Sequence, residues 1–187
     1  MEDQTTNNLF HNLPAGPNPP NKVFCVVEIP RGKSNKYEYN KDLGVFKLDR
    51  ALYSSVFYPT EYGFIPQTFS KEDGDPLDIM VLSTFTTFPG CLLTTNPIGM
   101  LEVIDSGKKD SKIIAIPSND PRFEEMDKLS KISDHVKKEI ESFWETYAAL
   151  QPEKEINVGS WGQAKKAKKL IREAQEEYHK RFPTREK

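Results

Sequence analysis

The stretch EDGDPLDIMVL, residues 72–82, joins an acidic turn to a short apolar run. Asp73, Asp75 and Asp78 lie within six positions, and the apolar residues 79–82 follow at once. Asp and Gly are turn residues, whereas four consecutive apolar residues after a turn are typical of a buried strand. The sequence therefore concentrates negative charge at the start of a predicted strand.

Three interpretations of this acidic turn compete. The first is a solvated turn, since Asp-Gly-Asp-Pro is good turn chemistry. The second is a calcium loop of the EF-hand type, which is disfavoured because Thr84 stands where such a loop needs its last Glu. The third is a magnesium site, because Mg²⁺ takes few carboxylates, keeps several waters and shares its shell with substrate phosphates. The turn alone leaves the first and third open.

Working outward, short apolar or alternating runs predict β-structure over residues 22–117. These runs are 23–29, 36–39, 44–49, 79–82, 98–104 and 112–117. Gly, Pro, Asn and Asp separate them, and Pro97 falls between two runs. Many short strands with no helix between them favour an antiparallel barrel or a sandwich.

Residues 118–187 have a different period and are expected to be mostly helical. Apolar residues recur at three- and four-residue spacing from 132 to 147, which is an amphipathic helical pattern that Pro152 ends. SWGQ (160–163) has the form of a capping box, so a second helix is expected to begin there. Its apolar face follows over 164–178.

The chain of 187 residues is expected to form one domain. Residues 1–21 contain four prolines and are expected to form an N-terminal arm that packs irregularly or not at all. A net charge of −2 gives no electrostatic footprint for nucleic acid, and no apolar run reaches the ~20 residues of a membrane span. Cys25 and Cys91 suit a reducing compartment, and the N-terminus has no apolar signal core. We therefore expect a cytoplasmic protein without nucleic-acid or membrane partners.

Other strand ends also carry carboxylates, together with Lys, Arg and Tyr. Asp105 and Asp110 flank a Gly-containing bend. Clustered carboxylates repel one another unless cations neutralise them, and Lys, Arg and Tyr donate to phosphate oxygens. Carboxylates for metal and donors for phosphate predict phosphoryl-transfer chemistry. The remaining residues of this kind are Glu28, Lys36, Glu38, Arg50, Tyr58, Tyr62 and Lys112.

At these residues the chain resembles the soluble family I inorganic pyrophosphatases, above all the short bacterial and archaeal forms. DGDPLD (73–78) carries the family signature, and VVEIPRG, KYEY, LDR and FYPTEYGFIP occur in the family's order. The resemblance implies a mainly β (α+β) fold, a five-stranded OB-like β-barrel with C-terminal α-helices. It also implies Mg²⁺-dependent hydrolysis of pyrophosphate to two orthophosphates, with several ions per site, in a homo-oligomer that is commonly a hexamer.

The resemblance assigns a role to each matching residue. Asp75 corresponds to the general base for a metal-activated water that attacks phosphorus, and Glu38 and Tyr58 correspond to supporting residues. The implied metal ligands are Asp73, Asp78, Asp105, Asp110 and, mainly through water, Glu28. The implied phosphate-binding residues are Lys36, Arg50, Tyr62, Lys112 and Tyr147.

One position departs from the family, and two rival functions stay open. Ala148 follows Tyr147 where the family usually has lysine, and Lys154 is the nearest basic residue that could turn inward. OB-like barrels also bind single-stranded nucleic acid through aromatic platforms, although the acidic cluster would repel that backbone. A different metal-dependent phosphohydrolase, acting on nucleotides, is disfavoured only through the family resemblance.

Overall fold

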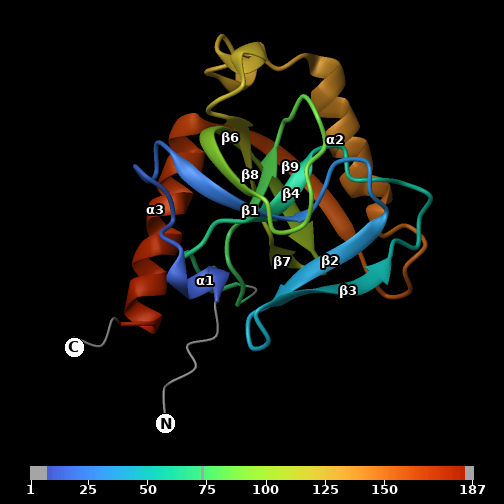
Figure 1. Ribbon diagram of the computed structural model, residues 1–187. Coiled ribbons are helices and arrows are strands. Elements are labelled where there is room, and N and C mark those ends of the chain that lie inside the picture. The colour runs from blue at the N-terminus through green and yellow to red at the C-terminus, as the bar shows by residue number, and fades with distance from the viewer. Residues whose placement is uncertain (1–7, 73, 184–187) are drawn as a thin grey trace.

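The computed structural model describes residues 8–72 and 74–183, so the predicted metal ligand Asp73 lies outside the described residues. Each strand of a five-stranded ring is paired with two neighbours, and β1 closes the ring by pairing with both β4 and β6. The predicted five-stranded OB-like barrel is confirmed. In ring order (Figure 1) the strands are β1 (Val23–Ile29), β4 (Glu61–Phe64), β5 (Asp78–Val81), β8 (Lys112–Pro117) and β6 (Leu92–Asp105).

The pairing within the ring is mixed, so the expectation of a purely antiparallel sheet was wrong. β5 and β8 run parallel, whereas β4 with β5 and β6 with β8 run antiparallel. A parallel pair needs a crossover connection, and β6 supplies it because it lies between β5 and β8 in the chain. Local apolar patterns predict where strands occur but not whether neighbouring strands run parallel or antiparallel.

β6 is the strand to which most of the sheet is attached. It pairs in turn with β1, with β8, with β9 (Ile156–Gln163) and with β7 (Lys108–Lys109). The sequence predicts a strand only over 98–104 with Pro97 outside it, yet Pro97 lies inside β6. The register shifts between Pro97 and Gly99, and proline is tolerated at such an irregularity because the ladder is already interrupted there.

β9 occupies the place where the sequence predicts the second helix to begin. Residues 160–163 belong to β9, and α3 (Ala164–Arg181) begins only afterwards. Gln163 is the N-cap residue but makes no side-chain capping hydrogen bond. The capping-box prediction was wrong because pairing with β6 satisfies the backbone groups of this segment, which a short helical turn cannot do as completely.

Two long helices cover different sides of the barrel, α3 at the left of Figure 1 and α2 (Asp134–Tyr147) at the upper right. The hydroxyl of Ser133 caps α2 by accepting from the backbone N–H of Val136. The short 3₁₀ helices η1 (Pro121–Phe123) and η2 (Leu129–Lys131) connect β8 to α2. The predicted helical faces are buried: Ile140, Phe143, Trp144 and Tyr147 in α2, and Ala167, Ile171, Ala174 and Tyr178 in α3.

The described part of the N-terminal segment packs against the rest of the chain, which is the first of the two alternatives, irregular packing or none, that the sequence left open. α1 (Leu9–Asn12) is capped by the side chain of Asn8, and Phe10 is only 2% exposed. A separate hairpin of β2 (Asn35–Asn40) and β3 (Val45–Ala51) lies beside the ring (Figure 1). Phe10 belongs to an aromatic cluster with Tyr39, Phe64, Phe69 and Tyr178, so it joins the hairpin to α3.

Candidate active site

The predicted site residues border one cavity of about 300 Å³ between the barrel, the β2–β3 hairpin and the end of α2. Arg50 is not in its lining, but its guanidinium donates to the hydroxyl of Tyr147 at 2.8 Å. The structure therefore gathers every predicted site residue that it describes. The lining includes Glu28, Lys36, Glu38, Tyr58, Tyr62, Asp75, Asp78, Asp105, Asp110, Lys112 and Tyr147.

A larger groove of about 540 Å³ lies between α3 and the 69–77 loop. Its charged lining mixes lysines with glutamates, and Lys71 pairs there with Glu177. Of the described predicted residues, only Asp78 and Asp110 reach it. The smaller cavity is the candidate active site because it holds the predicted phosphate-binding residues together with the carboxylates.

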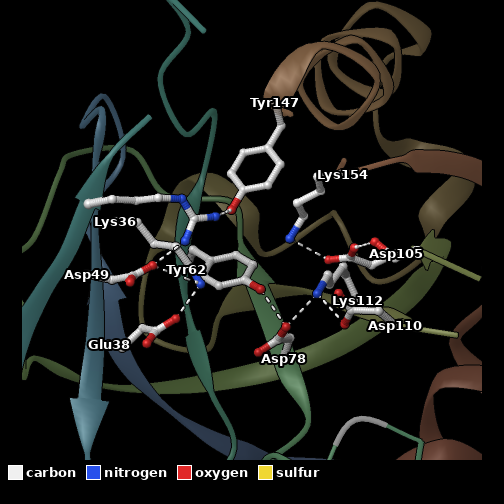
Figure 2. Close-up of polar contacts among 12 residues, drawn as sticks. Lys36, Glu38, Asp49, Tyr62, Asp78, Asp105, Asp110, Lys112, Tyr147 and Lys154 are labelled. Atoms are coloured by element: carbon white, nitrogen blue, oxygen red, sulfur yellow. Dashed lines mark hydrogen bonds and ion pairs between the residues drawn. The ribbon is translucent and has the colours of Figure 1, made fainter. Parts of the chain in front are cut away.

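Lys112 forms the charged centre of the acidic side of the cavity (Figure 2). Its ammonium donates to Asp78 at 2.5 Å and to Asp110, and it lies 4.9 Å from the ring centroid of Trp144. The side chain is only 1% exposed. Burial by itself would lower the pKa of Lys112, but Asp78 and Asp110 outweigh it and raise that pKa well above its ordinary value. Lys112 therefore stays charged and offsets the repulsion between two carboxylates.

We expect Lys112→Met to lower the free energy of unfolding by about 3 kcal/mol, because it leaves two partly buried carboxylates, Asp78 and Asp110, without their cation. Lys109→Met, which removes an exposed lysine of β7, is the control and should change stability by less than about 0.5 kcal/mol. Chemical denaturation of both variants in EDTA measures the difference. A loss of under about 1 kcal/mol in Lys112→Met would contradict the role of this lysine as a structural counter-ion.

The opposite side of the cavity carries donors suited to phosphate. Lys36 donates to Glu38 and lies 3.6 Å from Asp49 Oδ2 (Figure 2). Burial lowers the pKa of Lys36, but Tyr147 and Glu38 outweigh it and the net shift is upward. Among the described residues, Nε of Arg50 is buried without a hydrogen-bond partner. A buried guanidinium donor without a partner is costly, and the two other nitrogens of Arg50 donate to Asp49 and Tyr147.

Glu28 borders the same cavity as the acidic residues and the phosphate donors, near the end of β1. Its Oε1 accepts from the backbone N–H of Tyr39 at 2.7 Å. Burial and, secondarily, the charge of Asp78 raise the pKa of Glu28 to about 8, although the Tyr39 hydrogen bond opposes this. The charge of Lys36 lowers the pKa of Glu28 but does not outweigh burial, and a bound metal ion would favour the ionised carboxylate further.

Lys154 is brought into the site from the loop after α2. Its ammonium donates to Asp105 Oδ2 at 2.7 Å and lies 5.7 Å from the ring centroid of Tyr147. Burial raises the pKa of Asp105, but hydrogen bonds from Lys154 and Ser106 outweigh it and lower that pKa overall. Ala148 is 3% exposed and packs in the core, outside the cavity lining. Lys154 therefore brings an ammonium to the side of the site where the family usually has the lysine that follows Tyr147.

Sequence reasoning missed Lys41 and Asp49. Lys41, in the turn of the hairpin, donates to Asp75 Oδ1 at 2.7 Å. Asp49 accepts from Arg50, its neighbour in β3. The position of Asp49 beside Arg50 was a usable signal, because adjacent opposite charges at a strand end often share a site. For Lys41 the sequence offered no signal, since 34 positions separate it from Asp75.

The donor set fits a hard divalent cation. Six carboxylates of the described residues border the cavity, and carboxylate oxygens are the ligands that Mg²⁺ prefers. Among the described residues no three His, Cys, Asp or Glu side chains form a ready-made metal site. Lys112 accounts for part of this, because its ammonium pairs with Asp78 and Asp110. An OB-like barrel with acidic and phosphate-binding groups in one cavity defines a phosphoryl-transfer enzyme of the metal-dependent class.

Comparison with known proteins specifies the family. The family model described as inorganic pyrophosphatase matches residues 25–179. The chain is 44% identical to an inorganic pyrophosphatase of Halobacterium salinarum (94% of this chain, 98% of the relative). It is 48% identical to that of Picrophilus torridus (91% and 96%). The crystal structure of inorganic pyrophosphatase from Thermus thermophilus superimposes with a TM-score of 0.88 at 41% identity, covering 91% of this chain and 98% of that one.

The chain belongs to the soluble family I inorganic pyrophosphatases. Membership of this family implies hydrolase activity and a divalent metal cofactor. In the part of the chain that the structure describes, no helix is long and apolar enough to cross a membrane.

Proposed function

We propose that this chain hydrolyses inorganic pyrophosphate to two orthophosphates with Mg²⁺ as its metal. The observation that carries the proposal is the division of a single cavity into two parts. One part holds the carboxylates Asp78, Asp105 and Asp110, and the other holds Lys36 and Tyr147, whose hydroxyl accepts from the guanidinium of Arg50 behind the lining. A substrate made of two linked phosphates needs cations along its whole length, and this cavity offers them from both ends.

Each carboxylate and donor has a proposed task. Asp73, Asp78, Asp105 and Asp110 would hold metal ions, with Glu28 acting mainly through water. Bound Mg²⁺ supplies Lewis acidity that lowers the pKa of a water molecule and neutralises phosphate charge. Asp75 would accept a proton from the attacking water as the water oxygen bonds to one phosphorus, and the bridging P–O bond would break with its electron pair leaving on the second phosphate. The phosphate oxygens are held by Lys36, Arg50, Tyr62, Lys112 and Tyr147.

A direct assay of phosphate release distinguishes the proposed function from its two rivals. Wild-type chain is incubated with pyrophosphate, with ATP and with a phosphate monoester in Mg²⁺, and phosphate release is followed. Release chiefly from pyrophosphate supports the proposal. Faster release from ATP or from the monoester would overturn it in favour of another phosphohydrolase, and no release from any of them would favour a binding module.

We also propose that the chain, a single domain over 1–187, is a cytoplasmic homo-oligomer, on the model of its family. The two free cysteines, Cys25 and Cys91, agree with a reducing compartment. The buried apolar residues of α2, Ile140, Phe143, Trp144 and Tyr147, pack within the chain and are not free to form an interface. Large exposed apolar side chains lie elsewhere, among them Phe57, Phe85 and Phe88.

Sedimentation velocity at micromolar concentration tests the assembly. We expect a species several times heavier than the 21.4 kDa chain. The reason is that these phenylalanine side chains are 62–74% exposed, and burying them between copies of the chain lowers the free energy relative to leaving them in water. A monomer at that concentration would contradict the proposal while leaving the assignment of the active site untouched.

A further inference from the structure

Lys41 links the β2–β3 hairpin to the carboxylate that is the proposed general base. It lies in the turn between the two strands, and its Nζ donates to Asp75 Oδ1 at 2.7 Å. Both side chains line the cavity of the candidate active site. This contact joins the turn of the β2–β3 hairpin to the loop before β5, and the two residues are 34 positions apart in the sequence.

The hairpin turn is held in place from the N-terminal side. Asn8 Nδ2 donates to the backbone carbonyl of Lys41 at 2.9 Å, and the backbone N–H of Leu9 donates to the hydroxyl of Tyr39 at 2.9 Å. The ammonium of Lys41 lies 5.0 Å from the ring centroid of buried Phe10, at cation–π distance. Lys41 is therefore restrained both at its backbone carbonyl and at its side-chain ammonium.

The loop that carries Asp75 is fixed mainly through its backbone. The carbonyl of Asp75 accepts from the N–H of Ser70 at 2.9 Å, and Thr68 Oγ1 accepts from the N–H of Leu77 at 2.9 Å. The side chain of Asp75, in contrast, is 66% exposed. An exposed aspartate rotates readily between rotamers, so a charged partner at Oδ1 decides where the whole carboxylate points.

We infer that Lys41 is a positioning residue, which holds the carboxylate of Asp75 in the orientation needed to accept a proton from the attacking water. The inference rests on the proposed function and deepens it. A general base must lie within hydrogen-bond reach of the proton, and a displacement of about 1 Å costs roughly 10²-fold in rate. Lys41 acts on the chemical step and not on substrate affinity, because its ammonium engages the base.

The ion pair is suited to a clean test. Lys41 and Asp75 are both partly open to solvent, and exposed pairs contribute at most about 1 kcal/mol to stability. Lys41→Met therefore keeps the fold while removing the charge. Lys41→Arg keeps a donor of the same charge. Lys71→Met is the matched control, since Lys71 lies in the same loop as Asp75 but pairs with Glu177 at 2.8 Å.

The experiment measures kcat and KM for pyrophosphate in the full chain with Mg²⁺, in the wild-type and Asp75→Asn backgrounds. We expect Lys41→Met to lower kcat by about three- to five-fold, with KM within about two-fold. Lys41→Arg should recover most of the rate, and Lys71→Met should match the wild type. In the Asp75→Asn background, Lys41→Met should cause no further loss, because the two residues act as a unit.

Three results would overturn the inference while the wild-type chain remains an active pyrophosphatase. The first is a kcat for Lys41→Met within two-fold of wild type. The second is a raised KM at unchanged kcat, which would make Lys41 a substrate contact. The third is an equal loss in both backgrounds, which would make it independent of Asp75. A wild-type chain that releases no phosphate from pyrophosphate would overturn the proposed function itself, and the inference with it.

Discussion

Asp75→Asn is expected to lower kcat for pyrophosphate by about 10²–10⁴-fold while metal affinity stays close to that of the wild type. The amide has nearly the shape of the carboxylate but cannot accept a proton. In the structure Asp75 pairs with Lys41, apart from the cluster in which Lys112 joins Asp78 and Asp110. The change therefore removes the proposed base and leaves the acidic cluster intact. Initial rates at saturating substrate, together with the Mg²⁺-induced rise in melting temperature, measure the two effects separately.

Asp78→Asn is the variant with which Asp75→Asn should be compared. Asp78 accepts from both Tyr62 and Lys112, and it is a proposed metal ligand. Its replacement should weaken the stabilisation by Mg²⁺ as well as the rate, since a ligand and a partner of a buried lysine are lost together. An Asp75→Asn chain with a near-normal rate at neutral pH would show that another group accepts the proton.

The acidic part of the site was predictable because its residues lie close together in sequence. Asp75 and Asp78 share one turn, and Asp105, Asp110 and Lys112 share another. Such short segments fix the relative positions of their side chains, so a local pattern carries the chemistry. The contact between Lys41 and Asp75 was not predictable in this way. It depends on how the hairpin packs on α1, which only the complete fold determines.

The strands also divide into those that a local sequence pattern predicts and those that depend on the complete fold. The bounds of β1 and β8 agree with the predicted runs 23–29 and 112–117, because each is a continuous apolar segment between turn residues. β9 was missed because Gly159 and Gly162 interrupt its apolar pattern and most of its residues are exposed or partly exposed. What makes it a strand is the unpaired edge of β6, and that edge is created by distant parts of the chain. Tertiary pairing decided the conformation where local propensity was weak.

Removal of divalent metal is expected to abolish phosphate release, and excess Mg²⁺ should restore it. The carboxylates that border the cavity repel one another and the substrate unless cations neutralise them. Ca²⁺ should inhibit, because it accepts longer and less regular oxygen coordination than Mg²⁺ and would misplace the reacting groups. Rates in EDTA, after readdition of Mg²⁺ and with added Ca²⁺ measure this dependence. Full activity in EDTA would contradict the mechanism.

Glu28 gives the metal dependence a second readout that needs no turnover. Burial raises its pKa from 4.5 to about 8. Since the folded-state pKa is above the ordinary one, the contribution of Glu28 to the stability of the metal-free protein is complete below pH 4.5 and is lost as the pH rises through about 8. A bound cation favours the ionised carboxylate, so Mg²⁺ should bind with release of a proton within that range. Calorimetric titration at about pH 7 in two buffers of different ionisation enthalpy measures this proton, and Glu28→Gln is the control that cannot supply it. Equal proton release from the wild type and Glu28→Gln would mean that Glu28 is already ionised without metal, or that the metal ions do not reach its surroundings.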